Sequence, residues 1–151
     1  MPDGNGHQHA FVHVLDLKNE WAHCVDLTEG FATKPERSTA LTLSPDGDRL
    51  YVANTSTGSM AEIDTETLLI PRTETFDLDT RGNANAAVDP TGTLYVTSGV
   101  WVVAIDIASF SEIDRWPMTD RITGLQVGSR GRNVYVVLFL VVVDMVVKPG
   151  A

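Results

Sequence analysis

The sequence is poor in basic residues and in cysteine. It has 11 lysine and arginine residues against 20 aspartate and glutamate residues, which gives a formal net charge of −9. Nucleic acids and anionic membrane surfaces are both negatively charged, and both bind proteins through a basic face. This charge balance therefore argues against both partners. Cys24 is the single cysteine, which excludes an internal disulfide. The remaining composition, 43% apolar and 21% charged in 151 residues, is typical of one globular domain.

A long hydrophobic segment is also missing. The longest apolar run, Val134 to Val143, has ten residues, which is about half of what spans a bilayer as a helix. Its valine content favours a buried strand, so we expect no membrane insertion. The first ten residues contain proline, glycine and histidine where a secretory signal needs a basic and then an apolar segment. We predict a flexible lead-in at 1–10.

Catalytic motifs are missing as well. The sequence contains no Gly-x-Ser-x-Gly, no His-Glu-x-x-His and no phosphate-binding glycine loop. His23 and Cys24 are neighbours in an alternating segment, so they point to opposite faces of a strand and do not form a base and nucleophile pair. We expect Cys24 to pack in the core, and we expect no cofactor.

The sequence does contain a repeat, marked by a turn glycine, a tyrosine in the following strand and an aspartate that ends the next strand. The copies are Gly47, Tyr51 and Asp64; Gly92, Tyr95 and Asp106; and Gly131, Tyr135 and Asp144. Successive tyrosines are 44 and 40 residues apart, and the same ending occurs earlier at Asp16. Four alternating segments in about 42 residues, without a helical period, are the pattern of a β-propeller blade.

Other residues of the repeat have structural explanations. The aspartates that end the third strand of each unit are expected to accept hydrogen bonds from the amides of their own turn, rather than to act as acids and bases. Trp21, Trp101 and Trp116 are expected to fill gaps between blades.

These motifs resemble the YVTN-type β-propeller repeat, which occurs in seven-bladed propellers of bacteria and archaea. The matching segments are Ser44 to Gly47, Leu50 to Asn54 and Ile63-Asp64; then Asp89-Pro90, Leu94 to Thr97 and Ile105-Asp106; and then Val134 to Val136. The resemblance covers roughly residues 11 to 147 and implies a fold rather than an activity. Such propellers host sugar-lactone hydrolysis, amine-dehydrogenase-like oxidation and plain binding. Their frequent export favours an extracytoplasmic location.

We therefore predict an all-β fold: a partial, open β-propeller of about three to four blades of four-stranded antiparallel sheet. The expected divisions are a half blade at 11–27, blades at 39–78 and 86–118, an incomplete blade at 123–147 and a tail at 148–151. The turn at Leu138 to Leu140 lacks a residue suited to positive φ, which predicts a damaged or terminal blade.

The predicted strands number thirteen, and a closed ring needs at least about four blades of four strands. Three explanations stay open. The chain is a segment of a longer propeller, two copies associate through their open blade edges, or the reading frame is truncated.

Three arginines recur with the repeat. Arg37, Arg81 and Arg121 each precede an inner strand, and in a propeller these connections gather at one mouth of the central channel. They predict a site for a carboxylate or phosphate ligand, with Asn83 and Asn85 as further donors. The alternative is that each arginine pairs with a nearby acid. Those acids are Glu36, Asp79 and Asp120.

The four histidines are weaker evidence for a metal site than the arginines are for an anion site. His7, His9 and His13 alternate, so a continuous strand would present them on one face, and His23 lies across the following hairpin in a register that the sequence leaves open. They could bind zinc or copper, but no cysteine or carboxylate is spaced to complete a tetrahedral site. We predict no metal.

The leading interpretation is a non-enzymatic binding or interaction module, as a segment of a larger seven-bladed propeller. Its partner would be a small anionic ligand or a protein that meets the loops before the inner strands. The alternative is a fragment of a propeller enzyme, either sugar-lactone hydrolase-like or amine-dehydrogenase-like. Such an enzyme would need catalytic groups from further blades.

Overall fold

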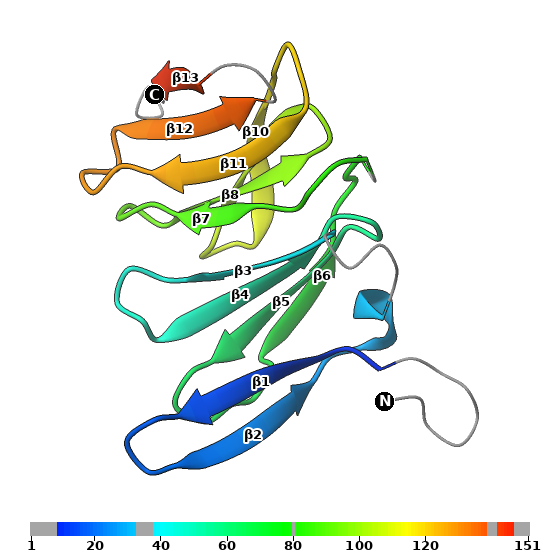
Figure 1. Cartoon of the computed structure of the whole chain (residues 1–151), viewed down its shortest axis with the longest axis vertical. Helices are drawn as coiled ribbons and strands as arrows, with labels where there is room; N and C mark the ends of the chain where they lie inside the picture. The colour runs from blue at the N-terminus through cyan, green and yellow to red at the C-terminus, as the bar shows by residue number, and fades with distance from the viewer. Residues whose placement is uncertain (1–8, 33–37, 80, 139–141, 147–151) are drawn as a thin grey trace.

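The computed structural model describes residues 9–32, 38–79, 81–138 and 142–146. This part of the chain is all-β: four antiparallel sheets of two to four strands follow one another and do not close into a ring (Figure 1). The predicted fold class is confirmed. No helix within these ranges is both long and apolar enough to cross a membrane. Residues 1–8 of the expected lead-in and the expected tail lie outside the described residues.

Each sheet is a simple meander in which every strand pairs antiparallel with the next one along the chain. The first sheet contains β1 (Phe11–Asp16) and β2 (Trp21–Asp26). The second contains β3 (Thr39–Leu43), β4 (Arg49–Asn54), β5 (Ser59–Asp64) and β6 (Arg72–Thr75). The third contains β7 (Ala86–Val88), β8 (Thr93–Ser98), β9 (Trp101–Asp106) and β10 (Ser111–Pro117). The fourth contains β11 (Ile122–Val127), β12 (Asn133–Leu138) and β13 (Val142–Val146). A short 3-10 turn, η1 (Glu29–Phe31), lies between β2 and β3.

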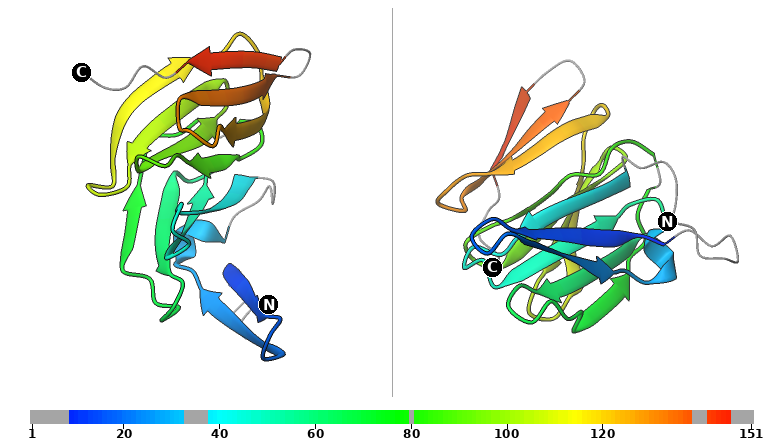
Figure 2. Two further views of the ribbon diagram at one scale, coloured as in Figure 1. Left: turned by 90° about the vertical axis from the view of Figure 1, so that its left-hand side faces the viewer. Right: turned by 60° about the horizontal axis from the view of Figure 1, so that its bottom comes forward.

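The apolar core consists of three clusters, and each lies between two successive sheets. The first and second sheets share Val12, Val25, Val52, Ala61 and Ile63. The second and third share Tyr51, Met60, Leu94, Val96 and Val103. The third and fourth share Tyr95, Val102, Ile122, Val134 and Val136. Because side chains alternate along a strand, neighbours such as Tyr51 and Val52 enter different clusters, so one strand serves both faces of its sheet. Figure 2 shows the sheets stacked along the long axis.

In each of the second, third and fourth sheets, the first two strands form what we call the inner hairpin. The turn of this hairpin and its open end lie on opposite sides of the molecule. In Figure 1 the turns between β3 and β4, β7 and β8, and β11 and β12 lie on the left, and residues 81–85, which lead into β7, lie on the right. Glycine occupies each turn at positive φ, as the repeat predicts: Gly47 at 80°, Gly92 at 94° and Gly131 at 63°.

The aspartates that end the third strands cap their turns. Asp64 Oδ1 accepts the N–H groups of Glu66 and Thr67 at 3.0 and 2.8 Å, and Asp106 Oδ2 accepts the N–H of Ser109 at 2.8 Å. These hydrogen bonds lower the pKa of both carboxyl groups, mainly through the Thr67 N–H in one turn and the Ser109 hydroxyl in the other. The predicted structural role of these aspartates is confirmed at both positions. The side chain of Asp144 lies outside the described residues.

Two predictions about the first sheet are wrong. Cys24 is exposed rather than packed in the core, and Trp21 is exposed rather than filling a gap between sheets. Cys24 and its register partner His13 lie on the face of the first sheet that is turned away from the cluster shared with the second sheet, whereas Trp21 is exposed at the start of β2 although it shares a face with the buried Val25. Trp101 and Trp116 do pack against clusters between sheets, as expected.

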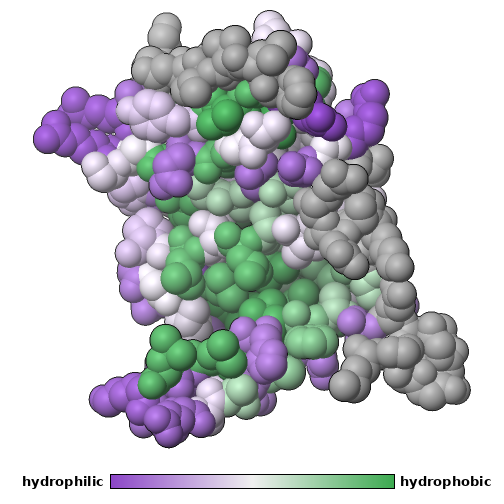
Figure 3. Space-filling view, viewed as in Figure 1, coloured by the Kyte–Doolittle hydropathy of each residue, from purple (hydrophilic) through white to green (hydrophobic). Residues whose placement is uncertain are grey.

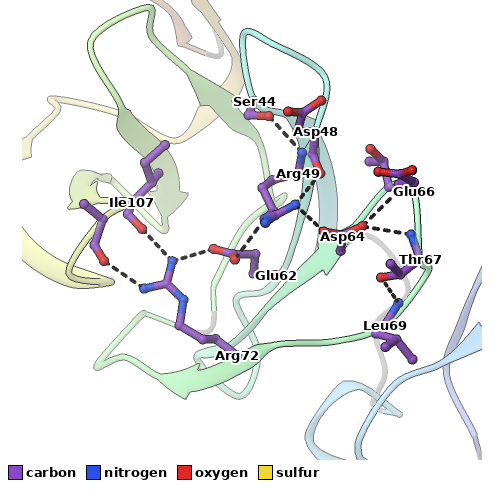
Figure 4. Close-up of polar contacts among 12 residues, drawn as sticks. Ser44, Asp48, Arg49, Glu62, Asp64, Glu66, Thr67, Leu69, Arg72 and Ile107 are labelled. Atoms are coloured by element: carbon purple, nitrogen blue, oxygen red, sulfur yellow. Dashed lines mark hydrogen bonds and ion pairs between the residues drawn. The ribbon is translucent and has the colours of Figure 1, made fainter.

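Arg72 joins the second sheet to the third (Figure 4). Its Nη2 donates to Glu62 Oε2 at 2.5 Å and to the carbonyl oxygen of Ile107 at 2.6 Å, and its Nη1 donates to the carbonyl oxygen of Ala108 at 3.0 Å. The guanidinium also lies 4.8 Å from the centroid of the Phe110 ring. One side chain of β6 therefore bonds to the backbone of the turn between β9 and β10.

Candidate functional site

The connection from β6 to β7 is held against the end of β8 by two buried hydroxyl groups. The Ser98 hydroxyl accepts the N–H of Asp79 and donates to the Asp79 carbonyl oxygen. The Thr97 hydroxyl donates to the carbonyl oxygen of Asn83 at 3.0 Å and accepts the N–H of Asn85 at 2.9 Å. Thr97 and Ser98 are fully buried, so these bonds form away from competing water. They fix the backbone of the connection at both of its ends.

The Asp79 carboxylate orients Arg81. Its Oδ1 accepts from Arg81 Nε at 3.0 Å and its Oδ2 accepts from Nη2 at 2.8 Å, which is a bidentate pair. This pair lowers the pKa of Asp79 and raises the pKa of Arg81. The Arg81 side chain nevertheless remains 85% exposed, and a guanidinium has five N–H donors, of which Asp79 accepts two.

Gly99 allows Asp79 to take this position. Its φ is +63°, and a Cβ atom there would lie 2.6 Å from Asp79 Oδ2, so a larger residue would displace the carboxylate. The orientation of Arg81 therefore depends on a glycine that follows β8.

The connection from β10 to β11 lies beside the first one. A Cβ atom on Gly82 would lie 3.7 Å from Arg121 Cγ, so the aliphatic part of Arg121 lies against the loop that carries Arg81. The backbone N–H of Arg121 donates to Asp120 Oδ1 at 2.7 Å. We use the name mouth loops for residues 79, 81–85 and 118–121, which form this surface.

The mouth loops contain Arg81, Asn83, Asn85 and Arg121 of the predicted site. Asn85 directs its amide inwards, since Nδ2 donates to Thr97 Oγ1 at 3.3 Å. The pairing of Arg81 with Asp79 is what the alternative interpretation of the arginines predicts. Arg37 lies outside the described residues.

The buried groups that hold the mouth loops were not identified from sequence. The available signal was a pair of polar residues, Thr97 and Ser98, directly after the apolar Leu94 to Val96. Asn54 occupies the same place in the second sheet and its Nδ2 donates to the carbonyl oxygen of Phe31 at 3.2 Å, which holds the preceding connection in the same way.

The remaining polar features are separate from the mouth loops. Strand register pairs His13 with Cys24 and Val14 with His23, so the two histidines occupy opposite faces of the first sheet. No group of three histidine, cysteine or carboxylate side chains among the described residues is arranged to hold a metal ion. A hollow of about 220 Å³ lies at the turn between β11 and β12, at the other end of the inner strands, lined by Arg130, Arg132, Asn133 and Tyr135 among others.

Comparison with known proteins supports the fold alone. No protein-family model matches the chain, and no curated protein matches it. Among solved structures the chain is similar to hydrazine synthase of Kuenenia stuttgartiensis, with 25% identity, a TM-score of 0.57 and coverage of 74% of this chain and 32% of that one. It is similar to a chain of a mitotic checkpoint complex, with 18% identity, a TM-score of 0.65 and coverage of 85% and 38%. It is also similar to a luciferin-regenerating enzyme, with 17% identity, a TM-score of 0.60 and coverage of 87% and 44%.

The chain thus spans less than half the length of each of these structures. The neighbours are β-propeller proteins, and no family model confirms the YVTN-type repeat. The stacked antiparallel meanders and these neighbours together assign the chain to the β-propeller fold, as an open arc of sheets.

Proposed function

We propose that this chain is a non-enzymatic binding module and a segment of a larger, seven-bladed propeller. The neighbours' greater length supports a larger whole, since the chain covers 32 to 44% of them. The one described as a mitotic checkpoint complex belongs to a protein assembly, which supports an interaction role for an arc of this kind. Rigid sheets that present loops at one end are suited to recognition.

The mouth loops are the proposed contact surface, and a small anion with a carboxylate or phosphate group is the proposed ligand. The observation that supports this most is the fixed orientation of Arg81. Buried hydroxyl groups hold its loop, Asp79 sets its guanidinium plane, and Arg121 lies on the adjoining loop. A guanidinium that is already ordered loses less conformational entropy when it binds an anion.

The test is titration of the purified chain with phosphate and with citrate, followed by calorimetry. We expect Arg81→Ala to weaken binding at least tenfold, because it removes the oriented donor. Arg132→Ala is the matched control, since it removes an equal charge at the other end of the inner strands, and it should bind as the wild type does. Equal affinity of wild type and Arg81→Ala would contradict the proposed site.

The second candidate is a segment of a propeller enzyme. It is favoured by the names of two neighbours, hydrazine synthase and luciferin-regenerating enzyme, which describe enzymes. Lactone hydrolysis and dye-linked amine oxidation by the purified chain would test it. If either reaction proceeds at a rate proportional to the chain concentration and the chain binds no anion, the enzyme candidate is favoured over the binding module.

A further inference from the structure

The pairing of Arg81 with Asp79 occupies one edge of the guanidinium and leaves another edge open. Asp79 accepts from Nε and from one N–H of Nη2, and among the described residues this guanidinium donates to no other group. Of the N–H groups that remain, one on Nη1 and one on Nη2 are parallel, and such a pair can donate to two oxygens of one carboxylate or phosphate. The side chain is exposed, so an anion can reach this edge from solvent.

An anion on this edge would lie close to the Asp79 carboxylate, because both would accept from Nη2. Asp79 Oδ2 lies 2.8 Å from Nη2. The two N–H bonds of one nitrogen diverge by about 120°, which places their two acceptor oxygens about 5 Å apart. Repulsion between two unit charges at about 5 Å in water changes a binding constant by about fourfold. The hydrogen bond from Arg81 lowers the pKa of the Asp79 carboxyl group, so this group stays charged at neutral pH and above.

The mouth loops offer no net positive charge to a doubly charged ligand. Arg81 and Arg121 are balanced by Asp79 and Asp120, and the whole chain has a formal net charge of −9. A second negative charge on the ligand is therefore attracted by Arg81 and repelled by Asp79 to a similar degree, and it adds to the cost of leaving water. A singly charged ligand can accept the same two hydrogen bonds without that added cost.

The surroundings of this edge are polar. On the face seen in Figure 3, the apolar surface gathers over the middle of the arc, and hydrophilic side chains lie at the upper right margin, where Figure 1 places the connection from β6 to β7. Recognition at the mouth loops therefore depends on hydrogen bonds and charge rather than on an apolar pocket. The charges hold fixed positions, because Ser98 bonds to the backbone of Asp79.

We propose that the mouth loops select a singly charged carboxylate over a doubly charged phosphate, and that Asp79 sets this preference. The inference rests on the proposed function, since it names which of the two anion classes the Arg81 site takes. Arg81 contacts the ligand, whereas Asp79 acts through Arg81: it orients the guanidinium and repels a second negative charge. The carboxylate can belong to a small acid or to the end of a polypeptide, because both present the same two oxygens.

The test is an NMR titration of the isotope-labelled full chain at pH 8 and constant ionic strength. The signals followed are the Arg81 Nε–H and the backbone N–H of Gly82. The probes are acetate, N-acetylglycine and methyl phosphate, which is a dianion at this pH because the second pKa of a phosphate monoester is about 6. We expect both carboxylates to bind at least threefold more tightly than methyl phosphate. Tighter binding of N-acetylglycine than of acetate would assign the carboxylate to a polypeptide end, and equal binding would assign it to a small acid.

Asp79→Asn separates the charge of this residue from its place in the fold. Ser98 bonds to the backbone N–H and carbonyl oxygen of residue 79, so the connection keeps its attachment in the variant. The affinity for methyl phosphate should rise about fourfold relative to that for acetate, because the repelling charge is gone. Glu66→Gln is the matched control. It removes an equal charge from the turn between β5 and β6, at the other end of the strands, and should keep the wild-type ratio of affinities.

Two results would overturn this inference and leave the proposed function standing. One is methyl phosphate that binds at least as tightly as the carboxylates, with the binding lost in Arg81→Ala. The other is a wild-type ratio of affinities in Asp79→Asn. A different result would overturn the proposed function and this inference together: no probe binds, or all three shift the Gly82 signal equally in wild type and Arg81→Ala.

Discussion

Tyr95 carries a buried hydroxyl group between the third and fourth sheets. Its side chain is 1% exposed, and its hydroxyl donates to Asp89 Oδ2 at 3.2 Å. Burial, with the Asp89 carboxylate as the second cause, raises the pKa of Tyr95 to about 12. Asp89 is itself anchored, because its Oδ1 accepts the N–H groups of Thr91 and Thr93 at 2.8 and 3.0 Å. Ionised Tyr95 would therefore face a buried carboxylate.

This arrangement predicts a loss of stability in alkaline solution. The folded state keeps the Tyr95 proton up to a pKa of about 12, whereas the unfolded chain releases it near pH 10. The stabilisation is therefore complete below pH 10 and is lost as the pH rises from 10 to 12, by about 2 kcal/mol. Urea unfolding at pH 8, 10 and 11.5 measures it.

Tyr95→Phe should flatten this pH dependence, although burial also raises the pKa of Tyr51, which leaves a residual slope. Tyr135→Phe is the matched control and should retain the wild-type profile, because the Tyr135 side chain is 39% exposed. An unchanged slope in Tyr95→Phe would show that Tyr95 is not responsible.

The three repeat tyrosines also show what sequence can predict for single residues. Their shared position in the second strand follows from the spacing of the repeat. Their burial does not, because Tyr51 and Tyr95 face a following sheet and Tyr135, in the fourth sheet, is exposed. A local pattern specifies which face of a strand a residue occupies, and the neighbouring sheet decides whether that face is covered.

Among the strands, Arg72 of β6 is a side chain that joins one sheet to the next. Its partner Glu62 is 8% exposed, and the other cation near that carboxylate is Arg49, with Nε at 3.4 Å from Oε1. Removing Arg72 leaves a nearly buried carboxylate with the more distant cation, and it leaves the carbonyl oxygens of Ile107 and Ala108 without this donor.

Arg72→Ala is therefore expected to lower the free energy of unfolding by about 2 kcal/mol. The double variant Arg72→Ala with Glu62→Gln should be more stable than Arg72→Ala alone, because it also removes the charge left behind. Urea denaturation of the three proteins provides the measurement. A single variant within about 0.5 kcal/mol of wild type would mean that the contact is no stronger than a surface ion pair.

The strands and their turns were largely predictable, whereas the attachment of the mouth loops was not. Turn glycines and capping aspartates act within a few residues of themselves, so their roles follow from local sequence. Ser98 acts on Asp79, 19 residues away, through a hydroxyl buried at the end of a strand. A polar residue in an alternating strand is normally assigned to solvent, so this contact needs the register of β8 against the connection.

At the scale of the whole molecule, the arc ends in two open sheet faces. Phe11 and Leu15 are exposed on the outer side of the first sheet, and Tyr135 and Val137 are exposed on the outer side of the fourth. In the interior of the arc the corresponding faces form apolar clusters. Exposed apolar faces of this kind are contact surfaces for another sheet.

We expect the purified chain to self-associate as its concentration rises, through these end faces. Val137→Asp should shift the association midpoint to at least tenfold higher concentration, because it places a charge in the contact. Sedimentation velocity over a dilution series measures this, and Ile113→Asp is the control for an added surface charge. A wild-type chain that stays monomeric at the highest concentration would contradict the prediction.

The open arc itself was predictable from the strand count, because thirteen strands are too few for a ring of four-stranded blades. The exposure of Cys24 was not, because the face of β2 that carries it is turned away from the second sheet; Trp21 shares a face with the buried Val25 and is exposed at the start of the strand. The proposed anion site was partly predictable: Arg81 and Arg121 follow from the repeat, and the pairing of Arg81 with Asp79 was one of the two interpretations that the sequence left open.

The hydrogen bonds that Arg72 donates to the neighbouring sheet end on main-chain oxygens, and this has a consequence for how such a protein can change. Carbonyl groups at a turn are the same whatever residues surround them, so duplication or exchange of one module preserves this joint while its loops diverge. Lineages could therefore lengthen or shorten an array of such modules before the interfaces between them had adapted.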